Sequence, residues 1–197
     1  KVFVEKPYGI QHEGQIWVAC NYRFHPAVKV LKDNLDKVGK VLYSRLYYSH
    51  YLPFQRKNWQ DYMKDTNILM DAGWHLVDLA LWLFGKASIS YKASFNLKFP
   101  FDDMAIIGLQ SERCPQIDIY CNYLRLDKVW GIEVVGTEGT LELRQAELCY
   151  MPSPKSKTLL SKCVNPDEMY CNQLNYLLKE DWQSNIDEHI EVLKICV

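Results

Sequence analysis

The chain has 197 residues, of which 48% are hydrophobic and 24% charged, and its formal net charge at pH 7 is −1. This composition is ordinary for a globular domain, and the near-neutral charge gives no electrostatic reason to expect nucleic acid or an anionic membrane as a partner. No apolar run approaches the ~18 residues of a membrane span, because the most apolar segment, 69–84, carries two carboxylates and an imidazole.

Seven cysteines are spread along the chain without a Cys-x-x-Cys pair. An odd number without that spacing argues against a disulfide framework, so we expect buried free thiols and a reducing, cytoplasmic location. The first seven residues also lack the long apolar core and the small-residue cleavage site of a signal peptide.

The predicted elements begin with two short buried strands at 1–4 and 16–20 and a helix over 26–35. The pattern then becomes rich in strands, several of which alternate apolar and polar residues as in an antiparallel sheet with one covered face. These strands are predicted at 41–51, 88–99, 104–109, 117–126, 131–135, 140–143 and 148–151, with a turn at 136–139. The basic segment 155–162 is predicted to be a solvated loop, and two closing helices are predicted at 168–178 and 186–195.

The most informative segment is an apolar helix predicted over 67–85, which Asn67 or Thr66 is expected to cap and Gly85 to end. At about 100° per residue, Asp71, His75, Asp78 and Trp82 share one narrow stripe of this helix. Unpaired buried charges cost several kcal/mol, so such a stripe must be satisfied or used.

Two interpretations of the stripe follow. Asp71 and His75 either pair with each other in a core helix or form a catalytic pair, and Asp78 is expected to support the structure around them. We predict no metal site, because a catalytic zinc needs three protein ligands and the other histidines show no spacing that completes the set.

Five segments in order resemble one protein family. They are Val4-Glu-Lys-Pro7, Cys20-Asn-Tyr-Arg-Phe-His-Pro26, Leu69-Met-Asp-Ala-Gly-Trp-His-Leu-Val-Asp78, Trp82-Leu-Phe-Gly85 and Glu133-Val-Val-Gly-Thr-Glu-Gly-Thr140. The chain thereby resembles the Gfo/Idh/MocA family of NAD(P)-dependent oxidoreductases, named for glucose–fructose oxidoreductase and inositol dehydrogenase. The resemblance implies an α/β (α+β) fold: a C-terminal domain with a large, mostly antiparallel open sheet covered by helices on one face, plus remnant strands of an N-terminal Rossmann domain. It implies that residues 1–25 end the nucleotide-binding domain and that 26–197 form the substrate-binding and oligomerisation domain.

The activity that the resemblance implies is hydride transfer between NAD or NADP and a hydroxyl or carbonyl of a sugar, sugar derivative or nucleotide sugar. His75 is the expected acid/base, and Asp71 would orient its ring or share its proton. Lys6 would polarise the substrate oxygen close to the nicotinamide. The expected cofactor-binding residues are Glu5, Lys6 and Pro7.

The substrate is expected to bind in a crevice that Asn21 and Arg23 face from beyond a strand end. Segment 51–62 is similar to a Leu-Pro-Asp-Trp-Arg…Asp-Tyr segment of relatives that act on sugars, although Phe54 and Gln55 break the match. Its aromatic faces would stack on sugar rings and its cations would bind carboxylate or phosphate. The expected substrate-binding residues are Asn21, Arg23, Arg56, Trp59, Tyr62, Asp71 and His75.

The sequence also departs from the family pattern. It has no Gly-x-Gly-x-x-Gly turn, on which a dinucleotide pyrophosphate normally rests. Nine residues separate Pro7 from Trp17, where a crossover helix needs about a dozen, and the lead into the 67–85 helix is short. The chain is therefore either a degenerate fragment or a sequence that lacks residues within 8–15 and 64–68. We favour the second, which predicts adjacent Cα atoms there farther apart than the ~3.8 Å of a trans peptide.

Two other functions stay open. One is a non-catalytic sugar or dinucleotide sensor, against which the presence of both Asp71 and His75 counts. The other is a truncated assembly module that keeps only the sheet domain. The resemblance also implies a homo-oligomer formed through the sheet.

Overall fold

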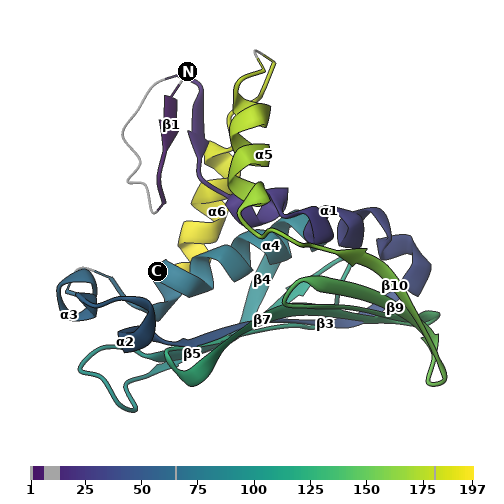
Figure 1. Ribbon diagram of the computed structural model, residues 1–197, viewed down its shortest axis with the longest axis horizontal. Coiled ribbons are helices and arrows are strands. Elements are labelled where there is room, and N and C mark those ends of the chain that lie inside the picture. Colours follow the sequence, from purple (N-terminus) through teal and green to yellow (C-terminus); the bar gives the residue numbers. More distant parts are fainter. Residues whose placement is uncertain (1, 7–13, 65, 180) are drawn as a thin grey trace.

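The structure is a computed structural model that describes residues 2–6, 14–64, 66–179 and 181–197. Its strands in the larger sheet are β3 Val41–Tyr51, β4 Ala87–Phe95, β5 Met104–Ser111, β6 Ile117–Asn122, β7 Leu124–Gly136, β8 Gly139–Arg144, β9 Glu147–Ser153 and β10 Ser156–Lys162. They form one eight-stranded sheet in the order β10-β9-β8-β7-β3-β6-β5-β4 (Figure 1). Only β3 and β6 pair in parallel within it. The predicted large, mostly antiparallel sheet is confirmed.

The helical elements gather on one face of this sheet, as predicted. They are η1 Asn21–Phe24, α1 Pro26–Asp33, η2 Leu35–Val38, α2 Leu52–Gln55, α3 Trp59–Tyr62, η3 Leu69–Gly73, α4 Trp74–Phe84, α5 Glu168–Leu177 and α6 Ile186–Cys196. In Figure 1, α1 and α4 lie along the sheet, and α5 and α6 stand above them beside the N-terminal strands. Among the described helices, none has both the length and the apolar character of a bilayer span.

The core fills the space between the sheet and these helices. Alternate residues of neighbouring strands point into it and are fully buried, including Leu46, Ile107, Ile119 and Ile132. Burying one such side chain contributes roughly 1.5–3 kcal/mol. The opposite face of the sheet is more polar, as the ion pair between Arg45 and Glu133 at 3.2 Å illustrates. The predicted alternation along the strands therefore corresponds to one covered and one open face.

A second, smaller core joins the two ends of the chain. Strands β1 Val2–Val4 and β2 Ile16–Val18 pair in parallel, and Asn185 holds β2 through hydrogen bonds to the backbone of Val18. Trp17 packs with Trp182 of the C-terminal segment. Parallel pairing is the arrangement of a Rossmann sheet, while the domain boundary at residue 25 stays a prediction. The chain breaks expected within 8–15 and 64–68 stay predictions, because residues 8–13 and 65 of these ranges lie outside the described residues.

One predicted loop is wrong. Residues 156–162 form β10, which pairs with β9 at the edge of the sheet. Lys157 and Lys162 lie 3.8 and 2.9 Å from Glu142 and Glu147, so the lysines are cross-strand ion-pair partners. Edge strands carry lysine because it discourages further strand pairing, and that composition imitates a solvated loop.

The seven cysteines are free; six are buried, as predicted, and Cys171 is exposed. The turn predicted at 136–139 connects β7 and β8. The strand predicted over 117–126 instead divides at Tyr123 between β6 and β7.

The apolar helix starts with a wider turn than predicted. Asn67 caps it, since its side-chain oxygen accepts the Met70 N–H at 3.0 Å. The Trp74 N–H then donates to the carbonyl of Leu69, five residues back, so η3 is a π-helical turn. Helix α4 follows and ends at Gly85, whose φ of 84° suits glycine. The extra residue in η3 changes the direction of Asp71 relative to the residues of α4.

Candidate active site

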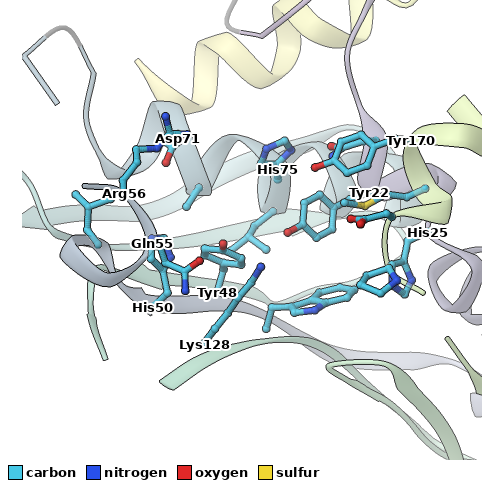
Figure 2. Close-up of a pocket in the computed structure, with 18 residues that line it drawn as sticks. Tyr22, His25, Tyr48, His50, Gln55, Arg56, Asp71, His75, Lys128 and Tyr170 are labelled. Atoms are coloured by element: carbon cyan, nitrogen blue, oxygen red, sulfur yellow. The ribbon is translucent and has the colours of Figure 1, made fainter. Parts of the chain in front are cut away.

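A cavity of about 380 Å³ lies between the start of the apolar helix and the sheet. Figure 2 shows Asp71 and His75 on one side of it, Tyr48 and Lys128 on the sheet side, and Tyr22 and Tyr170 at one end. The residues that line it come from η1, β3, α2, η3, α4, β7 and the start of α5. They are Asn21, Tyr22, His25, Tyr48, His50, Leu52, Gln55, Arg56, Asp71, Ala72, His75, Leu76, Lys128, Trp130, Pro166, Asp167, Met169 and Tyr170.

Asp71 is the centre of a hydrogen-bond cluster. Lys6 Nζ donates to its backbone carbonyl at 2.8 Å and lies 3.3 Å from its carboxylate Oδ1. The hydroxyls of Tyr62 and Tyr123 donate to the two carboxylate oxygens, each at 2.5 Å. Burial alone would raise the pKa of Asp71, but the charge of Lys6 and the two tyrosine hydrogen bonds outweigh it and lower that pKa. The carboxylate is therefore ionised and fixed in direction.

His75 lies one turn further along and is partly buried against Tyr22, with 5.0 Å between the ring centroids. Burial, and then the positive charge of Lys6, lower its pKa to about 3 against the opposing effect of Asp71. The imidazole is therefore neutral at physiological pH, the form in which one ring nitrogen is a proton acceptor.

The predicted pairing between Asp71 and His75 is not found in the described part of the chain. The π-helical turn η3 explains this, because it shifts the carboxylate toward the two tyrosines and Lys6. Asp71 orients the Lys6 ammonium rather than the imidazole.

The other predicted substrate residues divide into two groups. Asn21 and Arg56 line the cavity, and the Arg56 guanidinium lies 3.7 Å from the centroid of Tyr62. Tyr62 lies behind the cavity wall on Asp71, and Trp59 packs against Phe99, with 4.9 Å between their ring centroids.

The predicted cofactor residues lie in the segment that follows β1. Glu5 is exposed, Lys6 is bound to Asp71, and Pro7 is outside the described residues.

Arg23 does not face the crevice as predicted. Its Nε and Nη2 donate to the two oxygens of Asp78 at 2.9 and 2.5 Å, and Nη1 contacts Glu188. The side chains of Arg23 and Asp78 are only 7% and 5% exposed. The reason is that consecutive residues of η1 point in different directions, so Asn21 and Tyr22 reach the cavity while Arg23 turns to Asp78 of α4 and Glu188 of α6.

Sequence reasoning missed most of the sheet side of the cavity. Tyr48 and His50 lie two residues apart on β3, and Lys128 and Trp130 lie two residues apart on β7, so each pair shares one face of its strand. Their alternation was visible, but the pairing of β3 with β7 was not. Tyr22 and His25 belong to the 20–26 motif, the one sequence feature that points to them.

Two lining histidines are buried bases. Burial lowers the pKa of His25 to about 4, and it lowers that of His50 to about 4 with smaller contributions from nearby charges. In the described residues, the Nδ1 atom of each has no hydrogen-bond partner. The same part of the chain contains no group of three or more His, Cys, Asp or Glu side chains placed to hold a metal ion.

The chain belongs to the GFO/IDH/MocA family, because the family's C-terminal domain matches residues 31–142. The curated proteins contain no match. Among solved structures, the fold is similar to that of an oxidoreductase from Agrobacterium radiobacter in complex with NAD+, L-tartaric acid and magnesium. The TM-score is 0.74 and the identity 17%, over 98% of this chain and 68% of that one.

Two further structures are similar. A dehydrogenase from Clostridium difficile gives a TM-score of 0.76 at 16% identity, over 98% of this chain and 68% of that one. A levoglucosan dehydrogenase, in complex with NADH and levoglucosan, gives 0.74 at 16% identity, over 91% of this chain and 61% of that one. At these identities the likeness establishes the fold, and the chain spans about two thirds of the length of these proteins.

Proposed function

We propose that this chain forms the substrate-binding part of an oxidoreductase that transfers a hydride between NAD or NADP and a hydroxyl or carbonyl of a sugar-like substrate. The observation that carries the proposal is the meeting of Lys6, Asp71 and His75. Lys6 is 65 positions from Asp71 in the sequence, yet the two side chains touch at the cavity that His75 lines.

The position of Lys6 fits a nicotinamide cofactor. Lys6 follows β1, which is parallel to β2, and ligands of open α/β sheets bind beyond the carboxyl ends of such strands. The cofactor, when bound, supplies the site that accepts or donates hydride. Glu5, Lys6 and Pro7 are the proposed residues at its nicotinamide end.

His75, Lys6 and Asp71 are the proposed residues for the proton transfer and for the charge that develops during the reaction. His75 is neutral, so its imidazole takes the hydroxyl proton during oxidation and returns it during reduction. The Lys6 ammonium, held by Asp71, steadies the negative charge that develops on the substrate oxygen. Asp71 holds Lys6 in position through its backbone carbonyl and its carboxylate.

The cavity suits a small polyhydroxylated substrate. Its volume of about 380 Å³ lies within the range of small-molecule sites. Tyr22, Tyr48 and Trp130 supply aromatic faces for stacking, and the amides of Asn21 and Gln55 supply hydrogen bonds. Sugar-like substrates present both an apolar ring face and hydroxyl groups, which this lining matches.

The open face of the sheet is the proposed contact with a second copy of the chain. Tyr47 and Tyr120 lie on neighbouring strands there, beside the Arg45–Glu133 pair. Tyrosine and arginine, which this face presents, are enriched at protein–protein contacts. The free cysteines support a reducing, cytoplasmic setting.

The test uses the complete gene product. NADH and NADPH are titrated separately while protein fluorescence is followed, and the protein is then incubated with NAD+ or NADP+ and a panel of sugars. We expect quenching by at least one cofactor and reduction of the oxidised form. Failure of both cofactors to bind overturns the proposal.

A further inference from the structure

We infer that the substrate is acidic: a sugar acid or sugar phosphate whose anionic group is bound by Lys128, with Arg56 as a second cation. This inference rests on the proposed function, because it names the class of substrate for the same cavity. Carboxylate and phosphate share the relevant chemistry, since both accept charge-assisted hydrogen bonds from ammonium and guanidinium groups.

The first argument is that both cations line the cavity without a carboxylate partner. Over the described residues, neither Lys128 nor Arg56 forms a salt bridge. Their charged heads lie over rings: Lys128 Nζ lies 5.7 Å from the centroid of Tyr48, and Arg56 Cζ lies 3.7 Å from that of Tyr62. Ring contacts restrain the charged heads but leave their N–H donors available to a ligand.

The second argument is that the two charges act on the same part of the cavity. Burial is the main cause of the low pKa of His50; the charge of Asp71 opposes it, and the positive charges of Lys128 and Arg56 each lower the pKa further. A single imidazole on the cavity wall is thus influenced by both side chains. An anion bound there would interact with both cations.

The third argument is the uneven distribution of charge around the cavity. Asp71 is balanced by Lys6 and by two tyrosine hydroxyls, and the lining histidines are neutral. The other lining carboxylate, Asp167, forms no salt bridge with either cation. The lining thus offers a ligand two cations without a carboxylate partner, Lys128 and Arg56, against one carboxylate, Asp167, so its net charge is positive.

The arrangement also fits a substrate that spans the cavity. In Figure 2, Lys128 extends from the sheet toward Tyr22 and Tyr48, while His75 lies on the opposite, helical side. A carbinol held at His75 leaves the anionic end of the same molecule on the sheet side. The hydroxyls of Tyr22 and Tyr48 lie along this path to bind intermediate hydroxyl groups.

The experiment measures binding by calorimetry on the complete gene product, with D-gluconate, D-glucuronate, D-glucose 6-phosphate and neutral D-glucose as probes. The variants are Lys128→Met, Lys128→Arg and the matched control Lys157→Met, which removes the same charge from the edge of the sheet. We expect at least one acidic probe to bind about tenfold more tightly than D-glucose, and Lys128→Met to remove that preference. Lys128→Arg should retain most of it, and Lys157→Met should retain all of it. Comparing the carboxylates with the phosphate identifies which anion the site takes.

Equal binding of acidic and neutral probes, absence of binding by every acidic probe, or an acid preference that survives Lys128→Met overturns the inference. Turnover is measured separately with NAD+ and NADP+. Turnover of neutral sugars without acid preference leaves the proposed function standing and removes this inference. Acid binding through Lys128 in a protein that binds neither NADH nor NADPH removes the proposed function and leaves the binding site.

Discussion

The two carboxylates of the apolar helix have similar partners and different surroundings. Asp71 and Asp78 are each bound by a cation from the first 23 residues, Lys6 and Arg23. The Lys6 and Asp71 side chains are 12% and 22% exposed, whereas those of Arg23 and Asp78 are 7% and 5% exposed. One pair lies beside the cavity, and the other is closed off from it.

We assign the first pair to the proposed active site and the second to support of the fold. Both oxygens of Asp78 accept hydrogen bonds from a single bidentate guanidinium, which leaves the group no position for a ligand. Lys6 holds Asp71 as a single ammonium, beside a neutral imidazole and an open cavity. The Arg23–Asp78 pair also supports the cavity beside Lys6 and Asp71. Arg23 fixes η1 to α4 and so keeps the adjacent Tyr22 against His75.

The largest effect is expected from His75→Asn. Without the proton acceptor, kcat should fall by about 10²- to 10⁴-fold, while the dissociation constant of the nicotinamide cofactor stays within about twofold. Steady-state kinetics and fluorescence titration of the complete gene product measure the two quantities. A non-catalytic sensor would respond to cofactor equally well with and without His75, so an unchanged response and no turnover in either protein would favour that hypothesis.

Arg23→Ala should have the next largest effect, on stability. It leaves the Asp78 carboxylate buried without its main partner, which costs about 3–5 kcal/mol of unfolding free energy. Lys6→Ala is the matched comparison, and it should cost much less because Tyr62 and Tyr123 still donate to Asp71. Urea unfolding of both variants measures the difference. Equal losses would show that the two pairs do not differ as their burial indicates.

The comparison of Asp71 with Asp78 also shows how far the sequence could go. Helical spacing predicted the stripe, and alternation predicted β3 with the observed bounds of 41–51. The π-helical turn was not predictable, since a fixed 100° per residue assumes a regular helix. That turn decides the partner of Asp71. The direction of the Arg23 side chain likewise depends on its contacts with α4 and α6, and a local sequence pattern does not predict such long-range contacts.

The sheet side of the cavity shows the same limit on a larger scale. Tyr48 and Trp130 are paired residues of β3 and β7, separated by some eighty positions of sequence. Alternation indicates which side of each strand is covered, but only long-range pairing brings the two strands together. Helical spacing singled out Asp71 and His75 and family resemblance added Lys6, whereas Lys128 had neither signal.

Acid should destabilise the chain through its buried imidazoles. The folded-state pKa values of His25, His50 and His189 are about 4 and that of His75 is about 3, all below the unfolded value near 6.5. The unfolded state therefore binds more protons between these limits, and unfolding free energy should fall as pH drops from about 6.5 toward 4. His50→Gln should reduce the loss between pH 7 and pH 5 by roughly 1–2 kcal/mol. Urea midpoints at the two pH values test this, and an unaltered pH dependence in the variant would contradict it.

The smallest effect is expected at the edge of the sheet, where an ion pair of the same kind is exposed. Lys162 lies 2.9 Å from Glu147, closer than Lys6 lies to Asp71, but both side chains are more than half exposed. Exposed pairs are screened by water and salt, so Lys162→Ala should leave the thermal midpoint unchanged within error. Differential scanning calorimetry at low and high salt, with Arg23→Ala measured alongside, makes the test. If Lys162→Ala were as damaging as Arg23→Ala, distance would matter more than burial, and the contrast between closed and open pairs along the apolar helix would lose its physical basis.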